Sequence, residues 1–213
     1  MECDELIKQV RIVVNETGND DDVSLLSVDT CSLDENIKSL LPKAVSFVQH
    51  NKAIASKRVN VKSLLPMMLT PQVDSSGGAY IAFPPDFAAL YAVKLDGWEV
   101  PVDTILPLGS NEAKRQFCKY TRAGCCKPVC VESARPLGNG GMLLFPLPGG
   151  EKPSLSMFLY EAVYNPDEQL YGTDEDMVIA IVYECAALLY TMFERYDAAN
   201  SCHALAMAAC GAK

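Results

Sequence analysis

The sequence predicts an α+β fold, with helices at both ends of the chain and a β-rich centre. Two observations support this prediction. Apolar residues recur at helical spacing near both ends, whereas short apolar runs separated by glycine and proline fill the centre. A chain of 213 residues fits one structural domain, helical over residues 1–52, mainly β over 53–165 and helical over 166–213. We expect the β part to be an antiparallel sandwich or open barrel of about five or six strands.

Two amphipathic helices are predicted at the start of the chain. The first ends between Asn15 and Gly18, and its apolar residues are Leu6, Ile7, Val10, Val13 and Val14. The second is expected to begin at a capping box formed by Ser32 and Glu35. Its apolar stripe comprises Leu33, Ile37, Leu40, Leu41, Ala44, Val45 and Val48. Pro42 lies inside this stripe and should kink the helix.

The centre of the chain carries the strand signals. Residues 53–71 have a mixed pattern, which predicts irregular or weakly extended structure. Short apolar runs bounded by glycine and proline then predict strands at 79–83, 90–95, 98–102, 128–134, 142–145 and 154–164. The polar stretch 109–122 is long enough for a short helix. Glycines at 138–141 supply the positive φ values that a reversal between two of these strands requires.

The most informative β segment covers residues 91–102, which read as a hairpin. Its two-residue loop, Asp96-Gly97, favours a type I′ turn. The predicted cross-strand pairs are Leu95–Trp98, Lys94–Glu99, Val93–Val100 and Tyr91–Val102. The apolar members of these pairs then share one face, which we expect to be buried.

The last part of the chain predicts a buried helix and an alanine-rich helix. Thr173 is the expected N-cap of the buried helix, with acidic residues in the first turn, where they suit the helix dipole. The run 177–193 is apolar on all sides, so another part of the protein should cover it. The segment 198–212 is rich in alanine and is expected to dock on a neighbour or to fray.

Charge and composition limit the possible partners and compartments. A net charge of −9 argues against affinity gained by neutralising phosphates, although DNA can pass such a surface. The acidic residues Glu2, Asp4 and Glu5 do not fit a signal peptide, so secretion is not expected. The run 177–193 contains Glu184 and falls short of a bilayer span. The odd number of cysteines, nine, predicts reduced thiols in a cytosolic setting.

Four of these cysteines could form a tetrathiolate zinc site. Cys118, Cys125, Cys126 and Cys130 follow the spacing C-x6-C-C-x3-C, in which the adjacent Cys125 and Cys126 would point to opposite faces of an extended segment, and no histidine lies nearby. We therefore favour the interpretation that they are small hydrophobic residues in a reducing compartment. A cysteine nucleophile paired with His50 or His203 is the least favoured reading, because neither histidine lies in a recognisable catalytic context.

Three further patterns contain residue types that are found in binding sites. The run Asp20-Asp21-Asp22 lacks the spacing of a calcium loop and is interpreted as a solvated turn. The glycine pairs contain no phosphate-binding motif and are interpreted as turns. A basic and aromatic cluster fits a local acidic or phosphate contact, although a solvated face is the commoner explanation. The cluster comprises Arg115, Phe117, Lys119, Tyr120, Arg122 and Lys127.

The order of these features resembles that of tailed-bacteriophage head-to-tail connectors, the neck or adaptor proteins that form a ring beneath the portal. The resemblance covers residues 79–196, and the nearest group is the podovirus-like, crAss-like phages. Short amphipathic helices precede it, and the apolar helix at 177–193 closes it. The segments that carry it are Ala79-Tyr80-Ile81-Ala82-Phe83-Pro84-Pro85-Asp86-Phe87, Ala92-Val93-Lys94-Leu95-Asp96-Gly97-Trp98-Glu99-Val100-Pro101-Val102, Arg122 and Lys127-Pro128-Val129.

The resemblance implies a structural virion protein of the neck or tail, assembled in the host bacterial cytoplasm. Such a protein is no enzyme and has no catalytic, cofactor-binding or metal-binding residues. Its partners would be copies of itself in a closed ring, the portal protein, tail or other neck proteins, and double-stranded DNA that passes without sequence-specific binding, with no membrane. Helices at 6–14 and 33–48 are candidates for one contact patch, and residues 198–213 for another. The alternative is a small protein-binding module stabilised by zinc at the cysteine cluster.

Overall fold

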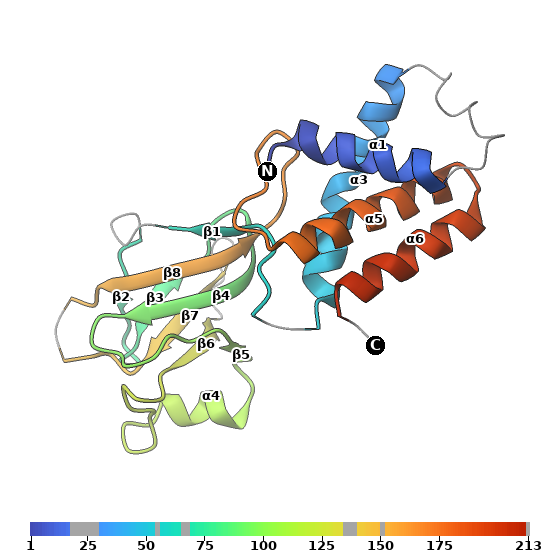
Figure 1. The fold of residues 1–213 in the computed structure, drawn as a ribbon. Helices are drawn as coiled ribbons and strands as arrows, with labels where there is room; N and C mark the ends of the chain where they lie inside the picture. The colour runs from blue at the N-terminus through green and yellow to red at the C-terminus, as the bar shows by residue number, and fades with distance from the viewer. Residues whose placement is uncertain (18–29, 54–55, 65–68, 134–139, 150–151, 212–213) are drawn as a thin grey trace. The chain divides into compact units, whose positions relative to one another are not determined.

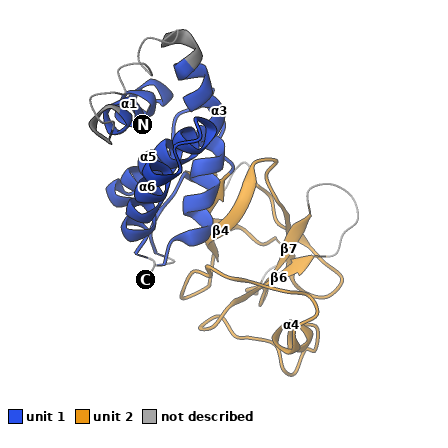
Figure 2. Cartoon of the chain, turned by 90° about the vertical axis from the view of Figure 1, so that its right-hand side faces the viewer, with its two compact units in different colours: residues 1–61, 163–213 blue, residues 62–162 orange. Residues whose placement is uncertain are grey.

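The computed structural model describes residues 1–17, 30–53, 56–64, 69–133, 140–149 and 152–211 (Figure 1). It confirms the predicted α+β class, with N-terminal helices, two open and mostly antiparallel sheets, and C-terminal helices. The chain divides into two compact units, which Figure 2 shows in different colours. Unit 1 comprises residues 1–61 and 163–213, and unit 2 comprises residues 62–162. Since two units can belong to one domain, the expectation of a single structural domain stays a prediction.

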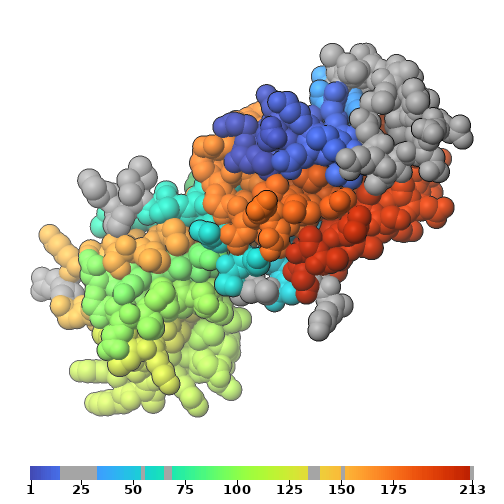
Figure 3. Space-filling model, viewed as in Figure 1, coloured from blue at the N-terminus to red at the C-terminus, as the bar shows by residue number. Residues whose placement is uncertain are grey.

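Unit 1 is a bundle of four described helices. They are α1 (Cys3–Thr17), α3 (Thr30–Asn51), α5 (Glu175–Met192) and α6 (Tyr196–Ala209). The helix α5 contacts the other three, and Figure 3 shows it between α1 and α6 on the visible face of this unit. Its buried residues form one core with the stripes of α1 and α3, so the predicted burial of the apolar run is confirmed for most of its residues, whereas Ile179 and Met192 are exposed.

The two N-terminal helices follow the predicted apolar stripes, with one error at a cap. In α1, Leu6, Val10 and Val14 are buried, as their spacing indicates. The helix α3 begins at Thr30, so Ser32 lies inside its first turn and the predicted capping box at this residue is wrong. The helix then continues through Pro42 to Asn51.

The two C-terminal helices are joined by a short turn. The N-cap of α5 is Asp174, so the prediction of Thr173 is wrong by one residue. The Thr173 hydroxyl donates instead to the carbonyl oxygen of Tyr171 at 2.8 Å. The alanine-rich segment forms α6, which packs on α5 through small buried side chains such as Ala199 and Cys202. Alanine and cysteine side chains let the two helices approach closely.

Unit 2 contains the strands of two sheets, and β1 begins at the boundary between the units. The three-stranded sheet has the order β1-β8-β4, formed by Val61–Ser63, Leu155–Ala162 and Phe87–Leu95. The five-stranded sheet has the order β2-β3-β7-β6-β5, formed by Gln72–Val73, Ala79–Ala82, Gly141–Phe145, Val129–Ser133 and Ile105–Leu106. The pairs β4–β8, β2–β3, β3–β7 and β6–β7 are antiparallel, whereas β5 and β6 are parallel.

The strand β7 is buried on both faces, which explains its continuous apolar sequence. Met142 and Leu144 join the core shared with Phe158 of the other sheet. The alternate residues Leu143 and Phe145 pack in a second cluster on the outer face. The short helix α4 (Asn111–Gln116) contributes Ala113 to that cluster, so the predicted helix within 109–122 is confirmed.

The predicted hairpin at 91–102 has its turn at the expected residues, but the predicted turn type and register are wrong. The Trp98 N–H donates to the Leu95 carbonyl at 3.1 Å, which closes the turn. Among the loop residues only Gly97 has positive φ, 89°, so the turn is not type I′, which needs two such residues. A single bridge pairs Val93 with Val102, and Val100 is exposed. The predicted Val93–Val100 pairing and the continuous strand at 98–102 are therefore wrong.

The burial of Trp98 accounts for the altered register. Its indole N–H donates to the carbonyl oxygen of Pro146 at 2.9 Å, and its ring lies in the core between the sheets. The following residue, Glu99, donates its N–H to Cys125 O at 3.1 Å instead of to β4. The Lys94 ammonium therefore reaches the Glu99 backbone carbonyl, at 3.2 Å, and not its carboxylate.

Candidate functional site

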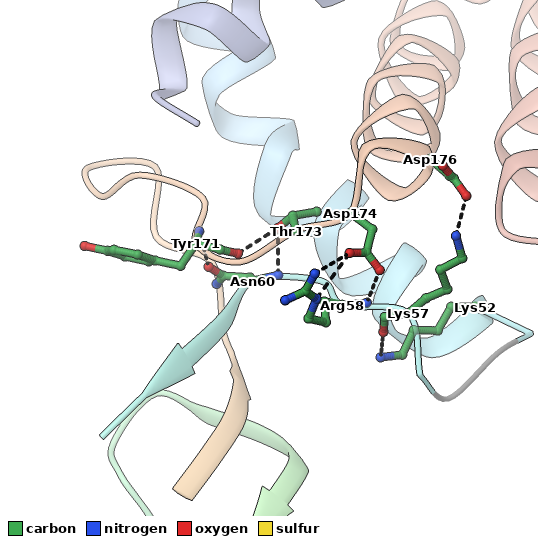
Figure 4. A network of polar contacts seen from close by, with 8 residues as sticks. All are labelled: Lys52, Lys57, Arg58, Asn60, Tyr171, Thr173, Asp174 and Asp176. Carbon is green, nitrogen blue, oxygen red and sulfur yellow. Dashed lines mark hydrogen bonds and ion pairs between the residues drawn. The ribbon is translucent and has the colours of Figure 1, made fainter. Parts of the chain in front are cut away.

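A network of polar contacts in unit 1 joins the chain after α3 to the start of α5 (Figure 4). We call it the polar junction. Its residues are Lys52, Lys57, Arg58, Asn60, Tyr171, Thr173, Asp174 and Asp176. Asp174 accepts from the Arg58 N–H at 2.9 Å and from the Arg58 guanidinium at 3.2 Å. Asp176 pairs with the Lys57 ammonium.

The charges of the polar junction stabilise one another. The backbone hydrogen bond from Arg58 is the main cause that lowers the pKa of Asp174 below its ordinary value. The hydrogen bond from the Lys57 side chain lowers the pKa of Asp176, and the same bond raises the pKa of Lys57. Each carboxylate is therefore held ionised beside a cation, which suits a structural tie better than acid–base catalysis.

Two unusual backbone conformations shape the junction. Asn60 is buried with φ of 52°, and its side-chain oxygen accepts from the Tyr171 N–H at 3.1 Å. Asparagine tolerates this left-handed region better than most residues do. Opposite it, Gly172 has φ of 37°, and a Cβ there would lie 2.8 Å from the Val61 carbonyl oxygen. The junction thus depends on a small residue at position 172.

Unit 1 also carries a surface hollow rich in carboxylates, of about 330 Å³, which we call the acidic hollow. Its lining residues are Glu2, Cys3, Asp4, Lys38, Pro166, Asp167 and Glu168. Lys38 is its one basic residue and lies 2.8 Å from Asp167. The hydrogen bond with Asp167 is the main cause that raises the pKa of Lys38. Because four carboxylates and one ammonium line the hollow, it favours a basic partner.

An apolar groove of about 270 Å³ lies between α1 and α5. It is lined by Gln9, Ile12, Val13, Ile179, Val182 and Tyr183. The two isoleucines are the most exposed, Ile12 at 53% and Ile179 at 45%. Neighbouring exposed aliphatic side chains of this kind are typical of contact surfaces. The sequence carried a signal for this groove that our prediction missed, since Ile12 is an apolar residue outside the Leu6–Val10–Val14 stripe of α1.

The basic and aromatic cluster of the sequence splits into an exposed part and a half-buried anchor. Lys114, Arg115, Lys119, Tyr120 and Lys127 are exposed, and we call them the basic tip. Tyr120 is 93% exposed. In Figure 3 the yellow-green segment around α4 ends in side chains that project into solvent. Among the described residues, no carboxylate lies within ion-pair distance of the four cations.

Arg122 is the anchor, because it points toward the protein. Its guanidinium donates to the carbonyl oxygens of Ser76 at 2.6 Å, Gly77 at 2.9 Å and Gln116 at 2.8 Å. It also lies 5.1 Å from the ring centroid of Phe145. Arg122 therefore fixes the loop that bears the tip onto the turn at Gly77, where φ is 77°.

The four clustered cysteines occupy different environments. Cys130 is buried in β6, and burial raises the pKa of its thiol. Cys118 and Cys126 are exposed, and Cys125 is half-buried. Hydrogen bonds from the Tyr120 backbone and the Thr121 side chain lower the pKa of Cys118. Within the described ranges, no group of three or more His, Cys, Asp or Glu side chains is disposed to hold a metal ion.

The two histidines have partners other than cysteine. His203 Nδ1 lies 2.8 Å from Oε2 of Glu184, a buried residue of α5. His50 Nδ1 lies 2.7 Å from the Ser46 carbonyl oxygen one turn earlier in α3. The run Asp20-Asp21-Asp22, considered above as a cation site, lies outside the described residues.

The comparisons with known proteins give no further lead. The chain matches no protein-family model, and a search of curated proteins finds no significant match. Among the helices of the described residues, none has both the length and the apolar character needed to cross a membrane.

Proposed function

We propose that this protein is a structural ring subunit, a head-to-tail connector that joins the portal of a tailed phage to its tail. The observation that carries the proposal is the apolar groove between α1 and α5 of a helical unit. A closed ring needs two different complementary patches on each subunit, because each copy contacts the next one head to tail. The groove supplies one patch, and the sequence resemblance supplies the class of assembly.

The second patch must be apolar to fill the groove. Two apolar side chains at the turn between α5 and α6 meet this requirement, since Met192 is 50% exposed and Tyr196 is 61% exposed. Removing apolar surface from water contributes about 25 cal/mol per Å². The sequence offered the helices at 6–14 and 33–48 as one contact patch, but their apolar stripes face the core of unit 1. The exposed Ile12 and its neighbours take their place.

The charge of the chain suits a DNA channel. A net charge of −9 repels phosphates, so DNA would slide through the lumen of the ring without sticking. The protein would act without catalysis, cofactor or metal. Its other partners would be the portal protein and tail or neck proteins, and it would assemble in the host bacterial cytoplasm.

Native mass spectrometry of the purified protein under reducing conditions tests this proposal over a series of concentrations. We expect a metal-free closed oligomer with one subunit count, and loss of that oligomer in the groove variant Ile179→Glu. The matched control Val73→Glu changes a similarly exposed side chain in unit 2 and should leave the oligomer intact. A wild-type protein that stays monomeric throughout would contradict the proposal. One zinc ion per chain that resists mild chelation would favour the zinc-stabilised module instead.

A further inference from the structure

We infer that the basic tip of one copy docks into the acidic hollow of a second copy. This inference rests on the proposed function, because it names an electrostatic contact of the same head-to-tail assembly. The tip comprises Lys114, Arg115, Lys119, Tyr120 and Lys127 in unit 2, and the hollow belongs to unit 1.

Hydrogen bonds fix the backbone of the basic tip in one conformation. The Ser110 side chain accepts from the Ala113 N–H at 3.1 Å and caps α4. The Thr121 hydroxyl donates to the Arg115 carbonyl at 2.9 Å, and Arg122 fixes the loop after it. A preorganised loop loses little conformational freedom on binding. Its exposed Tyr120 and Arg115 are of the residue types enriched at interfaces, where an aromatic ring adds contact area beside the charges.

Charge complementarity points to the helical unit as the partner. Unit 1 contains 18 acidic and nine basic residues, whereas unit 2 contains nine of each. The entire net charge of −9 therefore lies in unit 1, while residues 111–127 of unit 2 hold five basic residues and one acidic residue. Opposite patches on one chain attract a second copy and set the direction of assembly.

The acidic hollow is the part of unit 1 that best fits the tip. It gathers Glu2, Asp4, Asp167 and Glu168 around a concave surface whose lining contains one basic residue, Lys38. A lysine or arginine that enters it would gain several carboxylate partners at once. DNA is a less suitable partner for the tip, because the negative charge of unit 1 would repel its phosphates.

A charge-swap experiment tests this contact by analytical ultracentrifugation of the full chain. The tip-reversed variant is Lys114→Glu with Lys119→Glu, and the hollow-reversed variant is Glu2→Lys with Asp4→Lys. We expect each variant alone to self-associate about tenfold more weakly than wild type. Mixing the two variants should restore association. The acidic tip of the tip-reversed variant then meets the basic hollow of the hollow-reversed variant, and the unchanged tip of the second variant meets the unchanged hollow of the first. The control Lys43→Glu with Lys152→Glu makes the same charge change at other exposed lysines and should retain wild-type association.

The outcomes separate this inference from the proposed function. Association that survives tip reversal but not Ile179→Glu would overturn the inference and leave the ring intact. A monomeric wild type would overturn both. Tip reversal that reduces binding to a short DNA duplex without affecting self-association would show that the tip contacts phosphates, and would also overturn the inference. Circular dichroism melting of each variant excludes misfolding as the cause of lost association.

Discussion

Three hydrogen bonds join Arg58 and Asp174. The Arg58 backbone N–H and guanidinium both donate to the Asp174 carboxylate, and the Asp174 N–H donates back to the Arg58 carbonyl at 3.0 Å. Because Asp174 is the N-cap of α5, this reciprocal pair fixes where the central helix of unit 1 begins. The Asp174 side chain makes no capping hydrogen bond within α5, so its role is tertiary.

Replacing Asp174 with alanine should lower the free energy of unfolding by about 1–2 kcal/mol, because the Arg58 groups lose a charged acceptor. Urea denaturation measures this change. The matched control is Glu175→Ala, which removes an exposed acid at the next position and should change stability by less than about 0.5 kcal/mol. Equal losses in the two variants would show that only the helix dipole matters.

Three aspartates predict how stability depends on pH. The pKa values of Asp174 and Asp176 are lowered by hydrogen bonds from Arg58 and Lys57. Burial alone would raise the pKa of Asp86, but hydrogen bonds from Lys62 and Tyr160 outweigh it and leave the pKa lowered. In each case the unfolded chain binds the proton more tightly than the folded chain does.

Stability from these groups is therefore complete above the ordinary carboxyl pKa and is lost as pH falls through the lowered values. We expect the free energy of unfolding to be steady from about pH 7 to about pH 5 and to decrease below about pH 4. Urea titrations at a series of pH values measure it. The Asp174→Ala variant should show a shallower acid decrease than wild type. A slope as steep as that of wild type would refute the role assigned to Asp174.

Arg122 should matter more to stability than any residue of the basic tip. Arg122→Met removes three hydrogen bonds to carbonyl oxygens and should cost about 2–3 kcal/mol. Arg122→Lys should recover only part of this loss, because an ammonium cannot reproduce the planar fork of donors. The control Arg115→Met removes an exposed arginine and should have little effect. Guanidinium denaturation compares the three variants, and similar stabilities for Arg115→Met and Arg122→Met would contradict the anchor role.

The pair formed by Glu184 and His203 ties α6 to α5. His203→Ala would leave the buried Glu184 carboxylate without this partner and remove a ring contact with Phe47, at a cost of about 1–2 kcal/mol. The control His50→Ala removes a histidine bonded only within its own helix and should be nearly neutral. Hydrogen exchange of α6 amides provides the second measurement. Unchanged protection of α6 in His203→Ala would mean that the alanine and cysteine contacts alone hold α6 on α5.

Periodicity explains how much of this fold the sequence could predict. The stripes of α1 and α3 and the apolar strand β7 are local patterns, and each was predicted at its correct place. The hairpin register was not, because the tertiary contact between Trp98 and Pro146 decides it. In β8, a register shift opposite Lys94 and Leu95 leaves Met157 exposed, although simple alternation puts it on the face of Leu155.

The candidate sites likewise depend on tertiary contacts, which local sequence patterns do not predict. Arg122 and Lys119 look alike in sequence, yet one is an anchor and the other is exposed, and only the position of the Ser76-Gly77 turn separates them. The acidic hollow combines residues from the start of the chain with residues 166–168, which no local pattern connects. The polar junction likewise joins segments more than a hundred residues apart in the sequence.

Thiol reactivity offers the sharpest test of how the cysteines are used. Cys118 is exposed, and hydrogen bonds that favour its thiolate lower its pKa, so its reaction with iodoacetamide should persist to lower pH in the folded protein than in the urea-unfolded protein. Burial raises the pKa of Cys130, and raises that of Cys185 to about 12, so both should resist labelling in the folded protein. Mass spectrometry of peptides from partially labelled protein measures each rate, with urea-unfolded protein as the control in which all nine cysteines react.

Joint protection of Cys118, Cys125, Cys126 and Cys130 that a chelator abolishes would instead reveal a shared zinc ion, because thiolates bound to one metal lose their reactivity together.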